Sequence, residues 1–307
     1  MHRQLLDLVV CPGCLPEERP LAAHIQETRQ GDIYTATLTC PGCRKNYPID
    51  HGMACLLPQS DLALVGKYTE LPVVSAYLWS HFADLFDDPD QNTAYLSWSS
   101  MLNASSGVAL DTGCAVGRLT FELARNSELA VGIDRSHAFI QTARLLTREG
   151  RLSFDLIMEG ELTEHREVRL PHDWPLNRVE FVLADALALP FPKSVFQCSS
   201  SLNLLDKLPA PLKHLEELNR VTSDTRAQLL VADPWSWSTE IAPKTAWLGG
   251  VPSGSFAGHA HINVRHLLEN KLLPAWKILD EGTIQWTIRN HRNHFERIHS
   301  DYLLAQR

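Results

Sequence analysis

Four of the seven cysteines occur as two pairs of identical spacing. The two segments are Cys11-Pro-Gly-Cys14 and Cys40-Pro-Gly-Cys43. Each C-x-x-C turn directs two sulfurs at one centre, so two turns supply the four thiolates of a closed tetrahedral metal site. Because every ligand position is then filled, we expect the metal to be structural and not catalytic. Zinc is the expected metal, although four thiolates also suit iron.

A second chemical signal is the glycine-containing segment Asp111-Thr-Gly113-Cys-Ala115-Val-Gly117, which lies between a predicted strand and a predicted helix. Glycines at such a junction let the backbone approach a ligand closely. Gly117 is followed by Arg-Leu-Thr, so the segment matches neither the dinucleotide pattern G-x-G-x-x-G nor a phosphate-binding loop of the Walker type. Asp134 and Asp185 end the next two predicted strands. With Asp111, they are expected to converge at the carboxyl edge of one sheet, where doubly wound folds bind ligands.

The elements that must position these residues follow from the hydrophobic pattern. From about residue 107, short apolar runs alternate with helical periodicity, which predicts βαβ units and a mostly parallel sheet. The polar segment 153–175 interrupts the alternation and is expected to be an insertion. The predicted strands are Val108–Thr112, Ala130–Asp134, Val179–Leu183, Val195–Ser201 and Ala227–Ala232. Three helices are predicted to face the sheet through Leu119, Leu123 and Ala124; Phe139, Ile140, Ala143 and Leu146; and Leu212, Leu215, Leu218 and Val221.

The glycine-containing segment resembles motif I of the class I S-adenosylmethionine (SAM) methyltransferases, D-x-G-x-G-x-G, with alanine in place of the middle glycine. This resemblance implies an α/β fold with a doubly wound, Rossmann-like, seven-stranded sheet. It also implies that Asp134 binds the ribose hydroxyls and that Asp185 lies near the adenine. The cofactor-binding residues implied are Asp111, Gly113, Ala115, Gly117, Asp134, Arg135, Asp185, Ala186 and Asn203.

A narrower resemblance covers roughly residues 75–250. Residues 110–140, the insertion, Asn203-Leu-Leu and Trp247-Leu-Gly-Gly are similar to the C-terminal mercaptohistidine N-methyltransferase domain of ovothiol-biosynthesis enzymes. The resemblance implies a small-molecule acceptor with a nitrogen or sulfur nucleophile of the thiol or imidazole type. The cysteine-rich segment stands where those enzymes carry their iron-dependent sulfur-transfer domain.

The N-terminal segment resembles the zinc-ribbon activator subunits of tRNA methyltransferases. The resemblance is carried by residues 5–14, 38–43 and 47–53. A similar zinc knuckle precedes the methyltransferase domain of a bacterial ribosomal-RNA guanine methyltransferase family. We expect a zinc-ribbon domain over residues 1–58, a helical lid or linker rich in aromatic residues over 59–106 and the methyltransferase domain over 107–307. Residues 1–60 carry five Lys and Arg against six Asp and Glu, which argues against docking of RNA.

The acceptor is expected to lie among three segments predicted to leave the carboxyl edge of the sheet, namely residues 201–203, 233–237 and 281–286. Spacing places His291 and Phe295 on one face of a predicted helix. Cys55, Cys114 and Cys198 are expected to be packing residues, and no catalytic base is identified. The candidate substrate-binding residues are Tyr77, Trp235, Trp247, Trp286, Arg289 and His291.

Composition and charge limit the classes of function that remain possible. The net charge of −8 argues against a general nucleic-acid binder. No apolar run reaches the ~18 residues that span a bilayer, and the first residues do not resemble a signal peptide, so a cytoplasmic location is expected. Two alternatives to a small-molecule methyltransferase stay open. One is a tRNA, rRNA or protein methyltransferase whose zinc ribbon docks the substrate, and the other is a SAM-sensing or scaffolding protein. The oligomeric state is not predicted.

Overall fold

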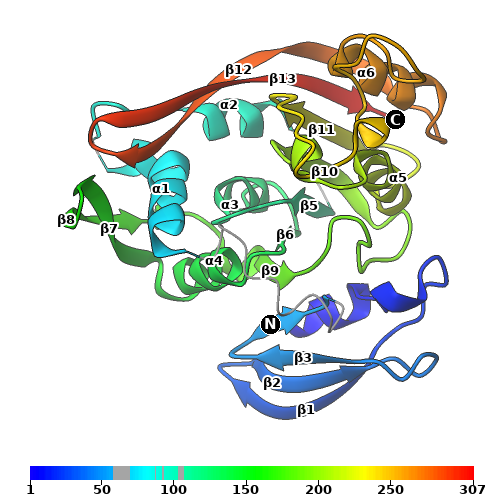
Figure 1. The fold of residues 1–307 in the computed structure, drawn as a ribbon. Coiled ribbons are helices and arrows are strands. Elements are labelled where there is room, and N and C mark those ends of the chain that lie inside the picture. The colour runs from blue at the N-terminus through cyan, green and yellow to red at the C-terminus, as the bar shows by residue number, and fades with distance from the viewer. Residues whose placement is uncertain (58–69, 87, 92, 103–106) are drawn as a thin grey trace.

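The computed structural model describes residues 1–57, 70–86, 88–91, 93–102 and 107–307. The expected boundary between residues 58 and 59, the first part of the expected linker and Tyr68 lie outside the described residues. A mixed sheet of eleven strands runs through the molecule in the order β1-β2-β3-β4-β9-β6-β5-β10-β11-β13-β12. Figure 1 shows the N-terminal strands at one end of the molecule and the β12–β13 hairpin at the other.

Seven of these strands form the predicted doubly wound sheet. Strands β9, β6, β5, β10 and β11 are parallel, and β13 pairs antiparallel with β11 and β12. The strand order reverses between β5 and β10, so the ligand crevice of such a fold is expected there. The doubly wound, seven-stranded α/β sheet expected from the sequence is confirmed. The bounds are β5 Val108–Thr112, β6 Leu129–Asp134, β9 Val179–Leu183, β10 Phe196–Leu202, β11 Gln228–Asp233, β12 Lys277–His291 and β13 His294–Gln306.

Helices cover both faces of the sheet and bury the predicted apolar stripes. One core contains Leu119, Phe139 and Ile140, and the core on the other face contains Leu215 and Leu218. The β5, β6, β9 and β11 strands are almost wholly buried, which explains why they are short apolar runs without alternation. The helices are α1 Leu71–Phe82, α2 Ala94–Met101, α3 Arg118–Ala124, α4 His137–Glu149, α5 Pro211–Val221 and α6 Ala260–Asn270. Short 3-10 turns occur at Arg3–Leu8, Pro12–Cys14, Ala83–Leu85, Leu176–Arg178, Leu205–Lys207 and Lys244–Ala246.

The N-terminal strands are β1 Ala22–Arg29, β2 Asp32–Thr39, β3 Asn46–Asp50 and β4 Met53–Cys55. The hairpin expected between the two cysteine pairs is confirmed as β1–β2. Strand β4 pairs in parallel with β9, so the N-terminal sheet continues the central sheet. The two parts also share one hydrophobic core, in which Leu5 and Leu38 belong to the same cluster as Phe191 and Phe196.

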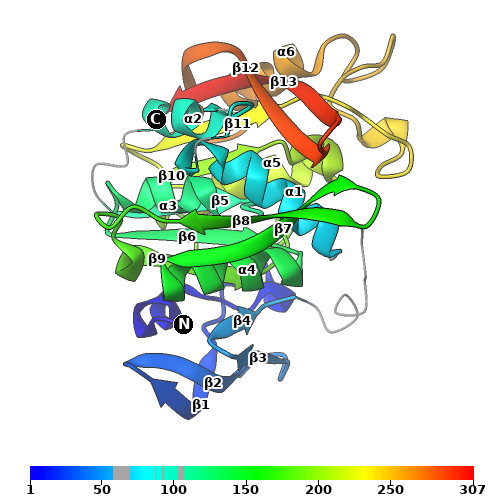
Figure 2. The same cartoon turned by 90° about the vertical axis from the view of Figure 1, so that its left-hand side faces the viewer.

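The insertion is a separate two-stranded hairpin, β7 Arg151–Glu159 and β8 Leu162–Arg169. Its inward face carries Phe154 and Leu156, which are buried beside α1 and α4. In Figures 1 and 2 this hairpin and α1 lie beside the distal end of the β12–β13 hairpin.

The helix predicted around His291 is wrong. His291 ends β12, His294 begins β13, and Arg289 pairs with Phe295 across the hairpin. The physical reason lies upstream, where Ile284, Trp286 and Ile288 alternate with polar residues at the two-residue period of a strand. Among the described residues, no helix is long and apolar enough to cross a membrane.

Candidate functional site

The glycine-containing loop makes a sharp left-handed path between β5 and α3. Gly113, Ala115 and Gly117 have φ angles of +71°, +47° and +90°. A Cβ atom at Gly117 would lie 2.4 Å from Cζ of Phe181, so this position needs glycine for space as well as for conformation. Ala115 adopts the left-handed region with a side chain, which costs about 1–2 kcal/mol. Strain of this kind is typical of functional loops.

Asp134, at the end of β6, fastens this loop to the neighbouring strand. Its Oδ2 accepts a hydrogen bond from the Ala115 N–H at 3.0 Å, and its Oδ1 accepts one from the Ser136 N–H at 2.8 Å. Burial raises the pKa of the Asp134 carboxyl, whereas the backbone donors lower it. Each carboxylate oxygen keeps a further lone pair, so Asp134 can accept bonds from two adjacent hydroxyl groups. The cradle therefore fits the ribose of a nucleoside cofactor.

Asp111 lies beneath the loop. Its carboxylate is 2% exposed and accepts hydrogen bonds from Thr120 Oγ1 at 2.8 Å and Ser200 Oγ at 3.2 Å. These bonds connect β5 to α3 and to β10, so Asp111 braces the turn from within the sheet. Burial raises the pKa of Asp111 to about 6.

This shift predicts a pH dependence of stability. The pKa of the folded-state carboxyl, about 6, exceeds the unfolded value of about 3.9, so the folded state retains the proton to higher pH. The stability that protonated Asp111 contributes is complete below about pH 4 and is lost as the pH rises to about 6. In chemical unfolding of the cofactor-free protein, we expect the wild-type free energy of unfolding to fall by about 2 kcal/mol relative to Asp111→Asn between pH 4 and pH 7. A difference between the two proteins that does not change with pH would contradict this assignment.

The end of β9 is held by a histidine that the sequence did not indicate. His214, fully buried on α5, donates from Nδ1 to the Ala186 carbonyl at 3.0 Å. Its Nε2 therefore accepts from Ser201 Oγ, 2.9 Å away at the end of β10. Burial lowers the pKa of His214 to about 4, so the ring is neutral near pH 7. Asp185 accepts from the Leu187 N–H at 2.9 Å and lies 3.9 Å from Nη1 of Arg135.

Asn203 follows β10 and connects the loop region to the β12–β13 hairpin. It has a φ of +55°, and its N–H donates to the Ala232 carbonyl at 2.7 Å. Its side-chain oxygen accepts a hydrogen bond from Ser300, which also accepts from Nε1 of Trp286 at 3.1 Å. Trp286 is inside β12, so the expectation that residues 281–286 leave a strand at the carboxyl edge is wrong. The long strand still brings Trp286 to this edge.

The other aromatic candidates fall into two groups. Trp235 and Trp247 lie on either side of Trp237, with ring centroids 6.3 Å and 6.2 Å from it. Tyr77 of α1 packs against Phe139 at the start of α4, with a centroid distance of 4.8 Å. The candidates at the distal end of the β12–β13 hairpin are not part of either group. His291 is partly exposed there, and Arg289 is 7% exposed.

Two further residues of α1 and α2 lie close to the glycine-containing loop. His81 Nε2 and the Tyr95 hydroxyl are 2.6 Å apart, and both side chains are buried. Burial lowers the pKa of His81 well below its usual value, so the ring is neutral. Nδ1 of His81 is buried and has no hydrogen-bond partner among the described residues. The sequence predicted a lid or linker here because the segment is rich in aromatic residues. No sequence pattern identified His81 as a candidate site residue.

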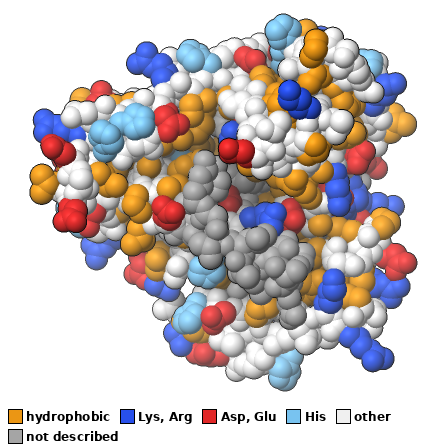
Figure 3. All heavy atoms as spheres, in the orientation of Figure 1, with side chains coloured by type: hydrophobic (Ala, Val, Ile, Leu, Met, Phe, Trp, Pro, Cys, Tyr) orange, Lys and Arg blue, Asp and Glu red, His pale blue; other side chains and the backbone are white. Residues whose placement is uncertain are grey.

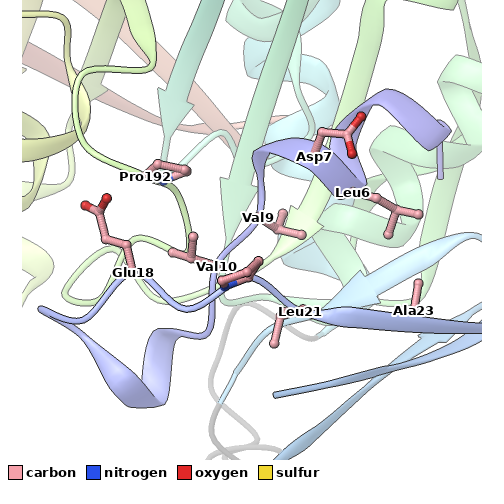
Figure 4. A pocket seen from close by; sticks show the side chains of 9 residues that line it. Leu6, Asp7, Val9, Val10, Glu18, Leu21, Ala23 and Pro192 are labelled. Carbon is pink, nitrogen blue, oxygen red and sulfur yellow. The ribbon is translucent and has the colours of Figure 1, made fainter. Parts of the chain in front are cut away.

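Side chains enclose the loop in this conformation. Cys114 and Ala115 are 3% and 5% exposed. Arg118, immediately after the loop, is 1% exposed and donates to both oxygens of Asp84 and to the His81 carbonyl. A cavity of about 500 Å³ lies elsewhere, between the N-terminal segment and Pro192 (Figure 4).

The four paired cysteines converge as predicted. Their Sγ atoms all lie within 4.8 Å of one another, with Cys11 and Cys43 3.6 Å apart and Cys14 and Cys40 3.7 Å apart. A tetrahedral metal with bonds of about 2.3 Å requires sulfur separations of about 3.8 Å. The Cys43 N–H donates to Cys40 Sγ at 3.5 Å, which orients that sulfur toward the centre. The cluster therefore has the geometry of a four-thiolate metal site.

Comparisons with known proteins find one family model and several solved structures that are similar to this chain. Residues 110–225 match the family model described as "Methyltransferase domain". No curated protein sequence matches the chain. A SAM-dependent methyltransferase from Methanosarcina mazei is 18% identical, with a TM-score of 0.45, covering 69% of this chain and 96% of its own. Magnesium protoporphyrin IX methyltransferase from Synechocystis, with bound SAM, is 17% identical, with a TM-score of 0.43, covering 79% of this chain and 100% of its own.

Proposed function

We propose that this chain, a SAM-dependent methyltransferase with its methyltransferase domain at residues 110–225, methylates a nitrogen or sulfur atom of a small molecule. The observation that carries the cofactor assignment is the pairing of Asp134 with Ala115. This hydrogen bond holds the strained loop at the point where the strand order of the sheet reverses. The Asp134 carboxylate keeps lone pairs that can accept hydrogen bonds from two hydroxyl groups of the ligand.

The residues of the chain hold the cofactor and exclude water. In this proposal Asp134 binds the ribose, and Gly113, Ala115 and Gly117 let the backbone lie against the cofactor. Asp185 and Ala186 flank the adenine, held in place by His214. Nδ1 of His81, which has no partner in the described part of the chain, can bond to the amino-acid end of the cofactor. Arg135 and Asn203 complete the set of cofactor residues.

The bound SAM supplies an electrophilic methyl group on a sulfonium, so the enzyme mainly has to align and desolvate the acceptor. Alignment alone can contribute about 7–11 kcal/mol. Tyr77, Trp235, Trp247 and Trp286 are the proposed aromatic walls of the acceptor site. A thiolate, amine or imidazole needs little activation beyond a nearby base.

The four cysteines are proposed to bind structural zinc, because their sulfur separations match a tetrahedral centre. A reducing compartment keeps paired cysteines from forming disulfides and available to bind metal, so we place the protein in the cytoplasm. Basic and acidic side chains are interspersed over the face shown in Figure 3, which favours a small-molecule acceptor over RNA. RNA binding that weakens steeply with salt would overturn this preference.

Titration of SAM and S-adenosylhomocysteine into the purified protein tests the cofactor assignment. We expect saturable binding below about 100 μM, in the usual range for enzymes. No binding at that concentration would overturn it. The acceptor is then sought with methyl-labelled SAM and a panel of thiols, selenols, imidazoles and amines, read by mass spectrometry. Tight SAM binding without methylation of any member would instead favour a SAM-sensing protein.

A further inference from the structure

The ends of two hairpins meet beyond the carboxyl edge of the sheet. The last pair between β11 and β13 is Asp233 with Asp301, so residues 294–300 of β13 and their partners in β12 project past that edge. Strand β7 follows α4 and returns toward the same edge, and it contacts both α1 and β12. Figures 1 and 2 both show the two hairpin ends beside α1.

Arg289 of β12 lies at this junction and is only 7% exposed. Its Nη1 is 3.4 Å from Oδ2 of Asp88, and its Nη2 is 3.4 Å from the sulfur of Met158 and 3.6 Å from Oε2 of Glu164. Its Nε is buried and has no partner among the described residues. A buried guanidinium normally has its donors satisfied, so these long contacts and the unpaired donor require an explanation.

Arg166 of β8 approaches the same carboxylate from the other side. Its Nη2 is 2.7 Å from Oε1 of Glu164, and its Nε is also buried without a partner in the described part of the chain. Each oxygen of Glu164 therefore faces a guanidinium from a different hairpin. Two arginines around one planar carboxylate form a receptor for that group, and here one of the chain's own side chains fills it.

The two acids of the cluster differ in how firmly they are held. Asp88 is 3% exposed and accepts from Nε1 of Trp79 at 2.8 Å and from the Asp90 N–H at 3.0 Å. The side chain of Glu164 is 31% exposed and lies two residues from the start of β8, so it can rotate into water. An external carboxylate that replaced Glu164 would keep the cluster neutral, with two positive and two negative groups.

We propose that Arg166 and Arg289 bind a carboxylate group of the methyl acceptor, which takes the place of Glu164 between them. The acceptor assignment rests on the proposed function. The cluster is connected to the cofactor region through β12, on which Trp286 lies three residues before Arg289, about 10 Å along the strand. Trp286 is connected through Ser300 to Asn203 beside the glycine-containing loop. An acceptor must extend at least about 10 Å to span that separation.

The site is tested first without SAM, using acetate as the probe. Glu164→Ala removes the internal carboxylate, and Glu161→Ala removes an exposed acid in the turn of the same hairpin. Binding of [1-13C]acetate is measured by NMR at fixed ionic strength. We expect Glu164→Ala to bind acetate at least tenfold more tightly than the wild type and Glu161→Ala. Adding Arg166→Met or Arg289→Lys should abolish that gain. Equal acetate binding by all variants would overturn the site, as would equally tight binding of inorganic phosphate to Glu164→Ala.

The acceptor assignment is tested second, in the methylation panel. Acceptors that carry a carboxylate should be methylated, and their carboxamide analogues should show KM at least tenfold higher with kcat little changed. Arg166→Met should raise KM for the carboxylate form in the same way while SAM affinity stays at the wild-type value. Equal KM for acid and amide would overturn the assignment. Because the acetate measurement needs no SAM, a failure of SAM binding would overturn the proposed function without obscuring this result.

Discussion

Replacing Cys40 with serine is expected to release the metal and unfold the N-terminal sheet. A structural zinc site contributes on the order of 10 kcal/mol to the folding of a small domain. The N-terminal sheet belongs to a segment of 57 described residues, which is too small to rely on a core of its own. Cys11 and Cys40 are themselves fully buried in that segment. Without the metal, their thiol groups would therefore remain in its core without their ligand.

The effect should extend into the catalytic half of the chain. Strand β4 covers the outer edge of β9, and Asp185 and Ala186 lie just beyond the end of β9. Glu18 also accepts from Nη1 of Arg220 at 3.0 Å and from the Lys193 N–H at 2.8 Å, which fastens the two parts together. We therefore expect Cys40→Ser to lower the Tm by at least 10 °C and to weaken SAM binding, although Cys40 is not among the proposed cofactor residues.

Metal analysis and thermal unfolding measure this outcome. The wild type should contain one zinc per chain, and a strong chelator should lower its Tm to that of Cys40→Ser. Cys55→Ala is the matched control, because Cys55 is buried on β4 but is not part of the cluster. It should retain the metal. A Cys40→Ser protein with the wild-type Tm and SAM affinity would show that the N-terminal sheet neither needs the metal nor supports β9.

The parts of the fold that were predictable are those with a local sequence cause. The five parallel strands are buried runs bounded by turns, and the loop after β5 is specified by its own glycines. The pairing of β4 with β9 joins residues more than a hundred positions apart through only two residue pairs, and no local pattern encodes such a contact. The β7–β8 hairpin was not predicted, although Phe154 and Leu156 of β7 alternate with polar residues at the two-residue period of a half-buried strand.

The same distinction applies to the candidate site. Asp134 was predictable because it ends a strand next to a recognisable loop, and the structure places it against Ala115. His81 and His214 are single buried histidines on helices, and only the tertiary structure brings them to the loop and the strand ends. Arg289 was predicted to bind the substrate, close to a segment that was expected to be helical around His291. The structure instead places it on a strand, where its neighbours come from a hairpin more than a hundred residues earlier.

Asp134→Ala is expected to lower the affinity for SAM by at least a hundredfold. The variant removes the acceptor for two hydroxyl groups, and hydrogen bonds to a charged group contribute about 1.5–3 kcal/mol each. It also leaves the Ala115 N–H without its 3.0 Å partner in a loop that is already strained. The loss should appear equally with S-adenosylhomocysteine, because the ribose is common to both ligands.

Calorimetric titration of both ligands measures the loss, and two variants separate binding from folding. Asp155→Ala removes an exposed aspartate on the outward face of β7 and should bind SAM like the wild type. Asp134→Asn keeps one carbonyl oxygen, so it should lie between the alanine variant and the wild type in affinity while its Tm stays within a few degrees of the wild-type value. That order is diagnostic, because a variant that only loosened the loop would lose stability and affinity together. Wild-type affinity in Asp134→Ala would remove Asp134 from the cofactor site, and with it the reason for placing the cofactor at this loop.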